Sequence, residues 1–229
     1  MSEYVFPPQP QPSVAVAGSE DRFPLRRIFC VGRNYAEHAR EMGHDPDREP
    51  PFFFDKPIDT IAEEGDAIPY PPATADLHHE GELVVALGKG GVDIPEDAAL
   101  DCVWGYAAGI DLTRRDVQAE AKKKGRPWTM AKGFDYSAVC GPVHPVAETG
   151  HLDKGSLRLS VNGEQRQNGD LADMIWSVPE VISYLSGLVE LKAGDLIYTG
   201  TPAGVSALER GDTCLVEIDG LAPLSISIG

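Results

Sequence analysis

The chain has 229 residues, 42% of them hydrophobic, and its 36 acidic against 20 basic residues give a formal net charge of −16. This length and apolar content are sufficient for one well-buried domain core, which excludes global disorder. The negative charge argues against partners that need clustered Lys and Arg, namely nucleic acids and anionic membrane surfaces.

The start of the chain, residues 1–18, is rich in Pro and Gln and predicts a flexible lead-in. A single domain is therefore expected over residues 19–229. Within it, the apolar run Arg27–Gly32 predicts a buried strand that ends in a glycine turn. A short helix is predicted over Asn34–Met42, with Asn34 as its cap. Residues 44–51 contain three prolines and a dense run of charges, so they predict a loop.

Strand signals dominate the rest of the chain. Glu82–Leu87 and Val103–Ile110 predict strands, and Arg114–Lys124 predicts a polar helix. The alternating segment Leu157–Val161 leads into Asn162-Gly163, the signal of a type I′ hairpin. The remaining predicted elements are a helix over Val178–Leu188 with Ser177 near its cap, and strands over Asp195–Thr199, Thr213–Ile218 and Leu224–Ile228. The pattern predicts a β-rich α+β fold with few helices.

The four cysteines, Cys30, Cys102, Cys140 and Cys214, are far apart and include no C-x-x-C pair. We therefore expect free thiols in a reducing cytoplasm, and neither a disulfide framework nor a structural zinc site. We also expect no signal peptide and no membrane span, because no long apolar run occurs.

The segment from His78 to Glu82 places two carboxylates at the start of a predicted strand. Residues two apart in an extended chain share a face, so Glu80 and Glu82 are expected to project together. Adjacent carboxylates repel each other unless a cation or a proton lies between them, and a hard ion such as Mg²⁺ or Mn²⁺ would relieve the repulsion. The alternative is a solvated, charged strand edge.

Asp111 adds a third carboxylate at the end of the predicted apolar strand, which is a typical position for a ligand. Its alternative role is to cap the amino end of the helix predicted over Arg114–Lys124. One side chain cannot readily do both, so the contacts of Asp111 distinguish a metal ligand from a helix cap.

Residues 114–132 carry seven basic side chains against two acidic ones, in a protein that is strongly acidic overall. For Lys122–Lys124 we expect a solvated helix face. Arg115, Gln118 and Lys132 are candidates for binding an anionic substrate, because such a substrate needs local cations that offset the negative charge of the whole protein.

Two further segments are candidate catalytic elements. His38 and Glu41 lie three residues apart on a predicted helix and so share a face, and a His held by a carboxylate can activate a water. The alternative is an ordinary surface pair. The glycine-rich segment Thr199–Val205 could present backbone N–H groups and the Thr201 hydroxyl to a carboxylate, or it could form a simple turn.

Together these segments resemble the fumarylacetoacetate hydrolase family. The similarity spans residues 28–229 and consists of short pieces in the same order as in that family. The pieces are Gly32-Arg33-Asn34-Tyr35 with His38 and Glu41, Asp55-Lys56-Pro57, His79-Glu80-x-Glu82-Leu83, Gly105-Tyr106 through Asp111, Asp116-x-Gln118, Lys132, Asn162-Gly163-Glu164, and Thr199-Gly200-Thr201-Pro202-x-Gly204-Val205.

The resemblance implies a mixed β-sandwich roll of the α+β class with few short helices, usually a homodimer, with one Mg²⁺ or Mn²⁺ per subunit. The residues similar to the family's metal ligands are Glu80, Glu82 and Asp111. Those similar to its catalytic groups are His38, Glu41 and Lys132, and those similar to its substrate-holding groups are Arg33, Arg115, Gln118 and Thr201. The resemblance also implies that a segment near residues 34–51 forms a mobile lid that orders when substrate binds.

The implied activity is hydrolysis of a carbon–carbon bond in a short acyl-pyruvate, a 2,4-diketo acid. Runs such as PYPPAT and GDLADMIW are similar to the branch of the family that cleaves fumarylpyruvate to fumarate and pyruvate in gentisate-type aromatic catabolism. The alternatives on the same metal site are decarboxylation of an oxaloacetate-type diacid and isomerisation or hydration of a related oxo-diacid. A metal-stabilised binding scaffold is the non-enzymatic alternative, but it leaves the His–Glu pair and Lys132 unexplained.

Overall fold

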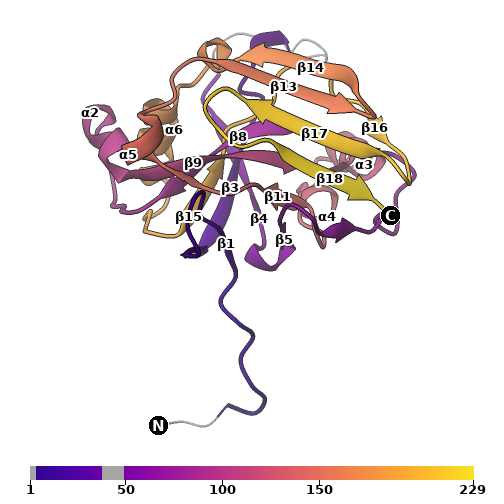
Figure 1. The fold of residues 1–229 in the computed structure, drawn as a ribbon, viewed down its shortest axis with the longest axis horizontal. Coiled ribbons are helices and arrows are strands. Elements are labelled where there is room, and N and C mark those ends of the chain that lie inside the picture. The colour runs from indigo at the N-terminus through magenta and orange to yellow at the C-terminus, as the bar shows by residue number, and fades with distance from the viewer. Residues whose placement is uncertain (1–3, 38–48) are drawn as a thin grey trace.

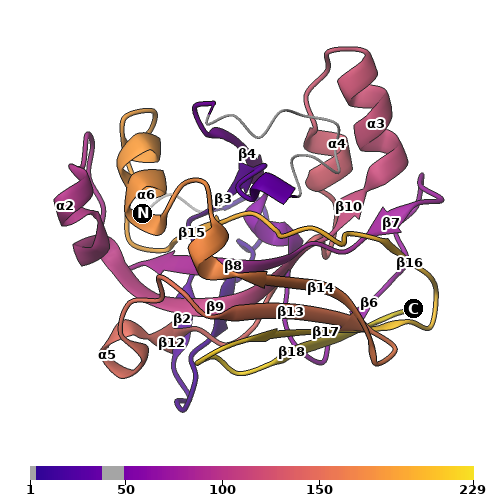
Figure 2. The same ribbon diagram turned by 90° about the horizontal axis from the view of Figure 1, so that it is seen from above.

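The protein folds into two β-sheets packed face to face, with helices grouped at the two ends, as the computed structural model shows for residues 4–37 and 49–229 (Figures 1 and 2). The larger sheet contains, in spatial order, β4 (Phe52–Lys56), β3 (Arg27–Gly32), β15 (Asp195–Tyr198), β8 (Gly81–Leu87), β9 (Val103–Asp111), β11 (Ala138–Cys140) and β5 (Ile61–Ala62), with β12 (His144–Pro145) also paired to β9. The second sheet contains β14 (Glu164–Asp170), β13 (Ser156–Val161), β17 (Thr213–Ile218), β18 (Leu224–Ile228) and β6 (Ala67–Ile68).

Two small ribbons and several short helices complete the described structure. The ribbons are β1 (Ser13–Ala15) with β2 (Arg22–Pro24), and β7 (Leu77–His78) between β10 (Thr113–Arg114) and β16 (Ala207–Leu208). The helices are α2 (Glu96–Ala99), α3 (Arg115–Lys123), α4 (Thr129–Lys132), α5 (Val146–Thr149) and α6 (Val178–Ser186), with 3₁₀ turns η1 (Ile58–Thr60), η2 (Leu100–Cys102) and η3 (Leu171–Asp173). Among the described residues, no helix has the length and apolar character needed to cross a membrane.

Strand β8 lies at the centre of the core and is buried along its whole length. Its odd-numbered residues Leu83, Val85 and Leu87 belong to the core between the two sheets, and Val84 and Ala86 face a second core beneath the β1–β2 ribbon. Because both faces are covered, β8 is a continuous apolar run after Glu82 and does not alternate. A carboxylate on this strand is therefore held away from water.

The predicted β-rich α+β fold with few short helices is confirmed. Asn162 and Gly163 have φ of 53° and 80°, the left-handed values that a type I′ turn requires. Ser177 and Glu180 form a capping box at the start of α6. The four cysteines are buried free thiols, as expected.

Two expectations for the first fifth of the chain need revision. Strand β1 lies inside the predicted lead-in 1–18, and its Val14 is fully buried, so ordered structure begins before residue 19. Among the described residues Asn34 caps no helix: its side chain donates to the carbonyl oxygens of Trp176 and Thr199 at 2.9 and 2.8 Å and accepts from the Trp176 N–H at 2.7 Å. Most of the predicted helix Asn34–Met42 and of the lid lies outside the described residues.

Candidate active site

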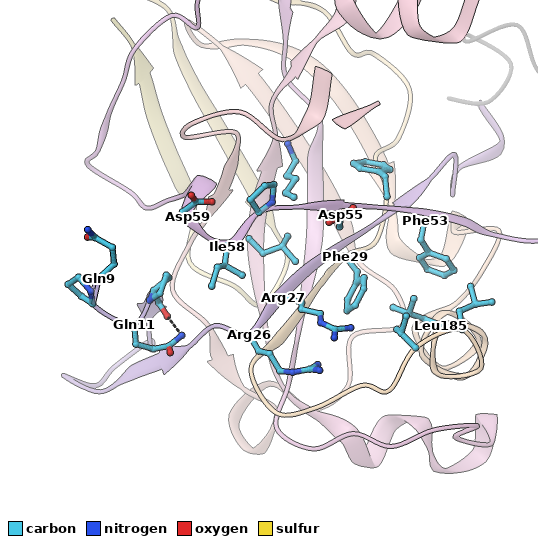
Figure 3. Close-up of a pocket in the computed structure, with 18 residues that line it drawn as sticks. Gln9, Gln11, Arg26, Arg27, Phe29, Phe53, Asp55, Ile58, Asp59 and Leu185 are labelled. Atoms are coloured by element: carbon cyan, nitrogen blue, oxygen red, sulfur yellow. Dashed lines mark hydrogen bonds between the residues drawn. The ribbon is translucent and has the colours of Figure 1, made fainter. Parts of the chain in front are cut away.

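A large cavity of about 1040 Å³ lies between the N-terminal segment, β3, β4 and the end of α6, but much of its wall is apolar (Figure 3). Phe29, Phe53 and Leu185 form much of its wall. The carboxylates of Asp55 and Asp59 at its edge are exposed to water. Because a catalytic site is marked by converging buried polar groups and not by volume, we place the chemistry elsewhere.

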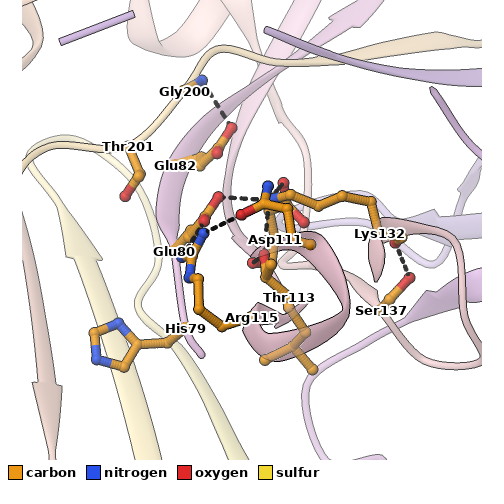
Figure 4. Close-up of polar contacts among 12 residues, drawn as sticks. His79, Glu80, Glu82, Asp111, Thr113, Arg115, Lys132, Ser137, Gly200 and Thr201 are labelled. Atoms are coloured by element: carbon orange, nitrogen blue, oxygen red, sulfur yellow. Dashed lines mark hydrogen bonds and ion pairs between the residues drawn. The ribbon is translucent and has the colours of Figure 1, made fainter. Parts of the chain in front are cut away.

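Converging polar groups lie where β8 and β9 meet, around Glu80, Glu82 and Asp111 (Figure 4). In the antiparallel pairing of the two strands, Gly81 lies opposite Ile110, and the Asp111 N–H donates to the Glu80 carbonyl at 2.9 Å. This register brings the three carboxylates together, with one oxygen of each within 4.8 Å of the others. All three side chains are buried, so the alternative of a solvated strand edge is wrong.

Asp111 does not cap a helix. Its Oδ2 accepts a hydrogen bond from Lys132 Nζ at 2.7 Å, and its Oδ1 lies 2.8 Å from Lys56 Nζ. The residue at the amino end of α3 is Arg114, which makes no side-chain capping bond. The contacts of Asp111 therefore favour a role as a metal ligand over a role as a helix cap.

Buried cations pair with two of the three carboxylates, Glu80 and Asp111. Lys132 Nζ donates to Glu80 Oε2, to Asp111 Oδ2 and to the Thr113 hydroxyl, each at 2.7 Å. Although burial disfavours its charged form, Asp111 and Glu80 outweigh that cost and raise the pKa of Lys132. Arg115 donates to Glu80 Oε1 at 2.6 Å. Burying charge is tolerated here because each ion has a close partner of opposite sign.

Glu82 is the exception, since it has no ion pair with any described residue. Its Oε2 accepts a hydrogen bond from the Gly200 N–H at 2.7 Å. Burial, followed by repulsion from Asp111 and Glu80, raises the pKa of Glu82 well above its usual range. A carboxylate in this position gains most from a nearby cation.

These residues fit a divalent ion. Ligand oxygens around octahedral Mg²⁺ lie about 3 to 4.2 Å apart, so the observed separation of up to 4.8 Å needs only a small contraction. Asp111 Oδ1 is buried with Lys56 Nζ 2.8 Å away, and an ionised carboxylate oxygen has a second lone pair that can bind a metal. All the donors are carboxylate oxygens, which suit Mg²⁺ or Mn²⁺ and not a metal that prefers thiolates. Glu80, Glu82 and Asp111 can therefore hold a metal.

The predicted loop Thr199–Val205 borders this cluster. The Thr201 hydroxyl donates to the Gly81 carbonyl at 2.8 Å and accepts from Gln167 Nε2 at 2.7 Å. Gln167, on β14, also accepts from the Gly81 N–H at 3.0 Å. Sequence reasoning missed Gln167, because nothing in its polar strand distinguishes a buried amide from its exposed neighbours.

His79 completes the support of the loop. Its Nδ1 lies 3.2 Å from Gln167 Oε1 and its Nε2 lies 2.9 Å from the Ser206 hydroxyl. Burial lowers the pKa of His79 to about 4, so it is neutral near pH 7. A neutral imidazole that donates from Nδ1 and accepts at Nε2 satisfies both partners and holds Gln167 in place.

One pocket is lined by Glu80, Glu82 and Thr201 and by four basic side chains, namely Arg33, Arg115, Lys122 and Lys132. Two of the predicted substrate-holding residues contact each other, with Arg115 donating to Gln118 Oε1 at 2.7 Å. The expectation that Lys122 belongs to a solvated face is wrong, because it is half-buried against Trp128, 5.1 Å from the ring centroid. Lys123 and Lys124 are exposed, as expected.

The pocket encloses about 30 Å³, roughly the share of one water in the liquid. Binding of a larger ligand therefore requires side chains at its edge to change rotamer, which is common on binding. His38 and Glu41, the predicted water-activating pair, lie outside the described residues. Their role remains a prediction.

Comparisons with known proteins agree on one family. The family model described as "Fumarylacetoacetate (FAA) hydrolase C-terminal" matches residues 27–228. Oxaloacetate tautomerase, mitochondrial, from Homo sapiens is 45% identical over 203 residues, which is 89% of this chain and 91% of that protein. Fumarylpyruvate hydrolase from Ralstonia sp is 42% identical over 190 residues, which is 82% of this chain and 98% of that protein. The crystal structure of fumarylpyruvate hydrolase from Pseudomonas aeruginosa in complex with Mn²⁺ and pyruvate has a TM-score of 0.96, with 50% identity and 99% of each chain covered.

Proposed function

Because the chain belongs to the fumarylacetoacetate hydrolase family, we propose that it is a metal-dependent hydrolase that cleaves fumarylpyruvate to fumarate and pyruvate. The observation that carries the proposal is the buried cluster of Glu80, Glu82 and Asp111, which lies next to several basic side chains. Such a site suits a small polyanionic substrate that is bound partly through a metal ion. The relative from Pseudomonas aeruginosa, with Mn²⁺ and pyruvate bound, supports this substrate class.

In this proposal Glu80, Glu82 and Asp111 hold Mg²⁺ or Mn²⁺. When bound, the ion supplies Lewis-acid polarisation of the substrate's keto oxygen. Arg115 and Gln118, already in contact, bind and orient the pyruvyl carboxylate. The role proposed for Thr201 is to close the other side of the pocket, with its hydroxyl fixed by Gln167 and Gly81.

The reaction then needs a proton acceptor and a site for negative charge. We assign proton abstraction from a water to His38, oriented by Glu41, on the basis of the family resemblance and their spacing. The hydroxide formed attacks the acyl carbonyl carbon, and the bond from that carbon to the pyruvyl methylene breaks. The electron pair moves into the pyruvate enolate, whose oxygen is stabilised by the positive charge of Lys132. Protonation of the enolate carbon gives pyruvate, and the acyl group leaves as a carboxylate.

The second candidate is interconversion of the keto and enol forms of oxaloacetate. It is favoured by the human relative, an oxaloacetate tautomerase at 45% identity. That reaction moves a proton between carbon and oxygen and needs no attacking water. Decarboxylation of oxaloacetate on the same site likewise needs no water. The two candidates therefore differ in whether a carbon–carbon bond is broken by water.

A substrate panel with Mg²⁺ or Mn²⁺ distinguishes these activities. Hydrolysis of fumarylpyruvate removes its enol-diketone absorbance and forms equal amounts of fumarate and pyruvate. Tautomerase activity changes the enol absorbance of oxaloacetate without forming pyruvate, and decarboxylation releases carbon dioxide with pyruvate. If no compound in the panel is turned over although the metal binds, the site is a binding scaffold and the proposal is wrong.

We further propose that the protein acts as a homodimer in the cytoplasm. The family resemblance supports the dimer, and the buried free thiols suit a reducing compartment. Light scattering on the purified protein at micromolar concentration tests the dimer, since a monomer mass there would contradict it.

A further inference from the structure

Two of the four cations in the site pocket have no carboxylate partner among the described residues. Lys132 and Arg115 are bound to Glu80, but Arg33 and Lys122 make no ion pair with any described residue. The Arg33 Nε is buried and has no hydrogen-bond partner within residues 4–37 and 49–229. Burial, followed by repulsion from Arg115 and Arg33, lowers the pKa of Lys122 to about 8. Both side chains are thus held where an anion would stabilise them.

An aromatic wall holds these two cations in place. The Arg33 guanidinium lies 4.8 Å from the Phe52 ring centroid, and Lys122 Nζ lies 5.1 Å from that of Trp128. The Phe52 and Trp128 rings pack edge to face, with their centroids 5.2 Å apart. Cation–π contacts of this kind stabilise a charged group without neutralising it.

The backbone adapts to make this arrangement. The Phe52 ring covers Gly32, where an added Cβ would lie 2.0 Å from a ring carbon, so the ring can occupy this place only over a glycine. Arg33 then takes a left-handed conformation with φ of 57°, which is uncommon for a residue other than glycine. Conformations of this kind persist where the surrounding structure maintains them and often mark functional sites.

We propose that Arg33 and Lys122 form a second carboxylate subsite, which selects acyl-pyruvates whose acyl group itself ends in a carboxylate. The inference rests on the proposed function and deepens it. The pyruvyl end of such a substrate is bound by the metal cluster with Arg115 and Gln118, so a further carboxylate at the other end needs its own cations. Arg33 and Lys122 are the cations of this pocket that the described carboxylates leave available. A substrate with a neutral acyl group would leave Arg33 and Lys122 without an anion, so its binding is disfavoured.

The test uses a pair of ligands that differ only at the distal end. The seven-carbon acid 2-oxoheptanedioate carries the second carboxylate, and 2-oxoheptanoate carries a methyl group there. Neither has the 4-keto group that hydrolysis requires, so both report binding. Calorimetry on the Mn²⁺-loaded protein measures each affinity for wild type, Lys122→Gln, Lys122→Arg and the matched control Lys123→Gln, whose exposed side chain lies next along α3.

We expect wild type to bind the diacid more tightly than the monoacid. Lys122→Gln should weaken diacid binding by about 10- to 100-fold, the usual worth of a hydrogen bond to a charged group, with a much smaller effect on the monoacid. Lys122→Arg should retain most of the preference, and Lys123→Gln should leave it unchanged. Arg33→Gln, checked for folding by its melting temperature, should lose the preference as Lys122→Gln does.

Equal affinity of wild type for the two acids would overturn the proposal, and so would an equal loss of both acids in Lys122→Gln. The proposed hydrolysis is judged separately, by turnover of fumarylpyruvate. If the diacid preference depends on Lys122 while no hydrolysis occurs, the subsite stands and the reaction assignment fails. If hydrolysis occurs without the preference, the reaction stands and the subsite fails.

Discussion

Replacing Lys132 by Met should destabilise the metal-free protein far more than the metal-loaded one. Met retains a flexible apolar chain that can fill the same space, but it removes the ammonium that bridges Glu80 and Asp111 at 2.7 Å. Removing one partner of a buried ion pair typically costs about 3–5 kcal/mol, because the remaining charge is left uncompensated. For a domain of this size, that corresponds to a melting temperature lower by about 6–20 °C.

Bound metal should reduce this difference, because the ion supplies the positive charge that the variant lacks. The assay is thermal unfolding of wild type and Lys132→Met, each in EDTA and in saturating Mn²⁺. The matched control is Lys124→Met, an exposed residue paired with Glu120 on α3, which should melt close to wild type in both conditions. In the loaded variant, we also expect kcat to fall about 10²–10³-fold through loss of charge stabilisation. If the melting temperature of Lys132→Met were lower than that of wild type by the same amount with and without Mn²⁺, this reasoning would be refuted. Lys132 would then not act as a counter-ion of the metal ligands.

Three further outcomes are expected. Glu82→Gln should weaken Mn²⁺ binding and leave the stability of the metal-free protein equal or higher. Because the folded-state pKa of Glu82 is raised, the stability of metal-free wild type should fall as pH rises through that pKa, and melting temperatures of the variant measured across the same pH range should not show this fall. His38→Ala should lose fumarylpyruvate hydrolysis by about 10²–10⁴-fold and Glu41→Gln by less, with any oxaloacetate decarboxylation retained, so equal loss of both reactions would contradict the water-activating role. The kcat/KM for fumarylpyruvate should decline above pH about 8, where the Lys122 ammonium of the free enzyme deprotonates. Lys122→Arg should abolish this decline, because Arg stays charged; if the variant shows the same decline, another group causes it.

The parts of the site that could be predicted from sequence are those that depend on local geometry. Strand periodicity places Glu80 and Glu82 near one another, and the apolar run before Asp111 identifies the end of a strand. The antiparallel register of β8 and β9 then brings the three side chains together. The type I′ turn at Asn162-Gly163 was equally predictable, because only a few residue types tolerate positive φ there.

The parts that could not be predicted depend on contacts between distant segments. Lys122 follows the pattern of a solvated helix, and only the position of Trp128 shows that it faces the pocket. Lys56 is buried because its ammonium reaches Asp111 and the Leu112 carbonyl, more than fifty residues away. Strands of two residues, such as β7 and β10, are too short to show any periodicity.

The most direct test of the central claim is to follow fumarylpyruvate with chelated protein before and after Mn²⁺ is added back. The account predicts no turnover in EDTA, and on restoring Mn²⁺ a loss of enol-diketone absorbance with one fumarate and one pyruvate formed per substrate. Full hydrolysis after exhaustive chelation would contradict the metal assignment. No hydrolysis with Mn²⁺ bound, together with rapid interconversion of the oxaloacetate tautomers, would contradict the reaction.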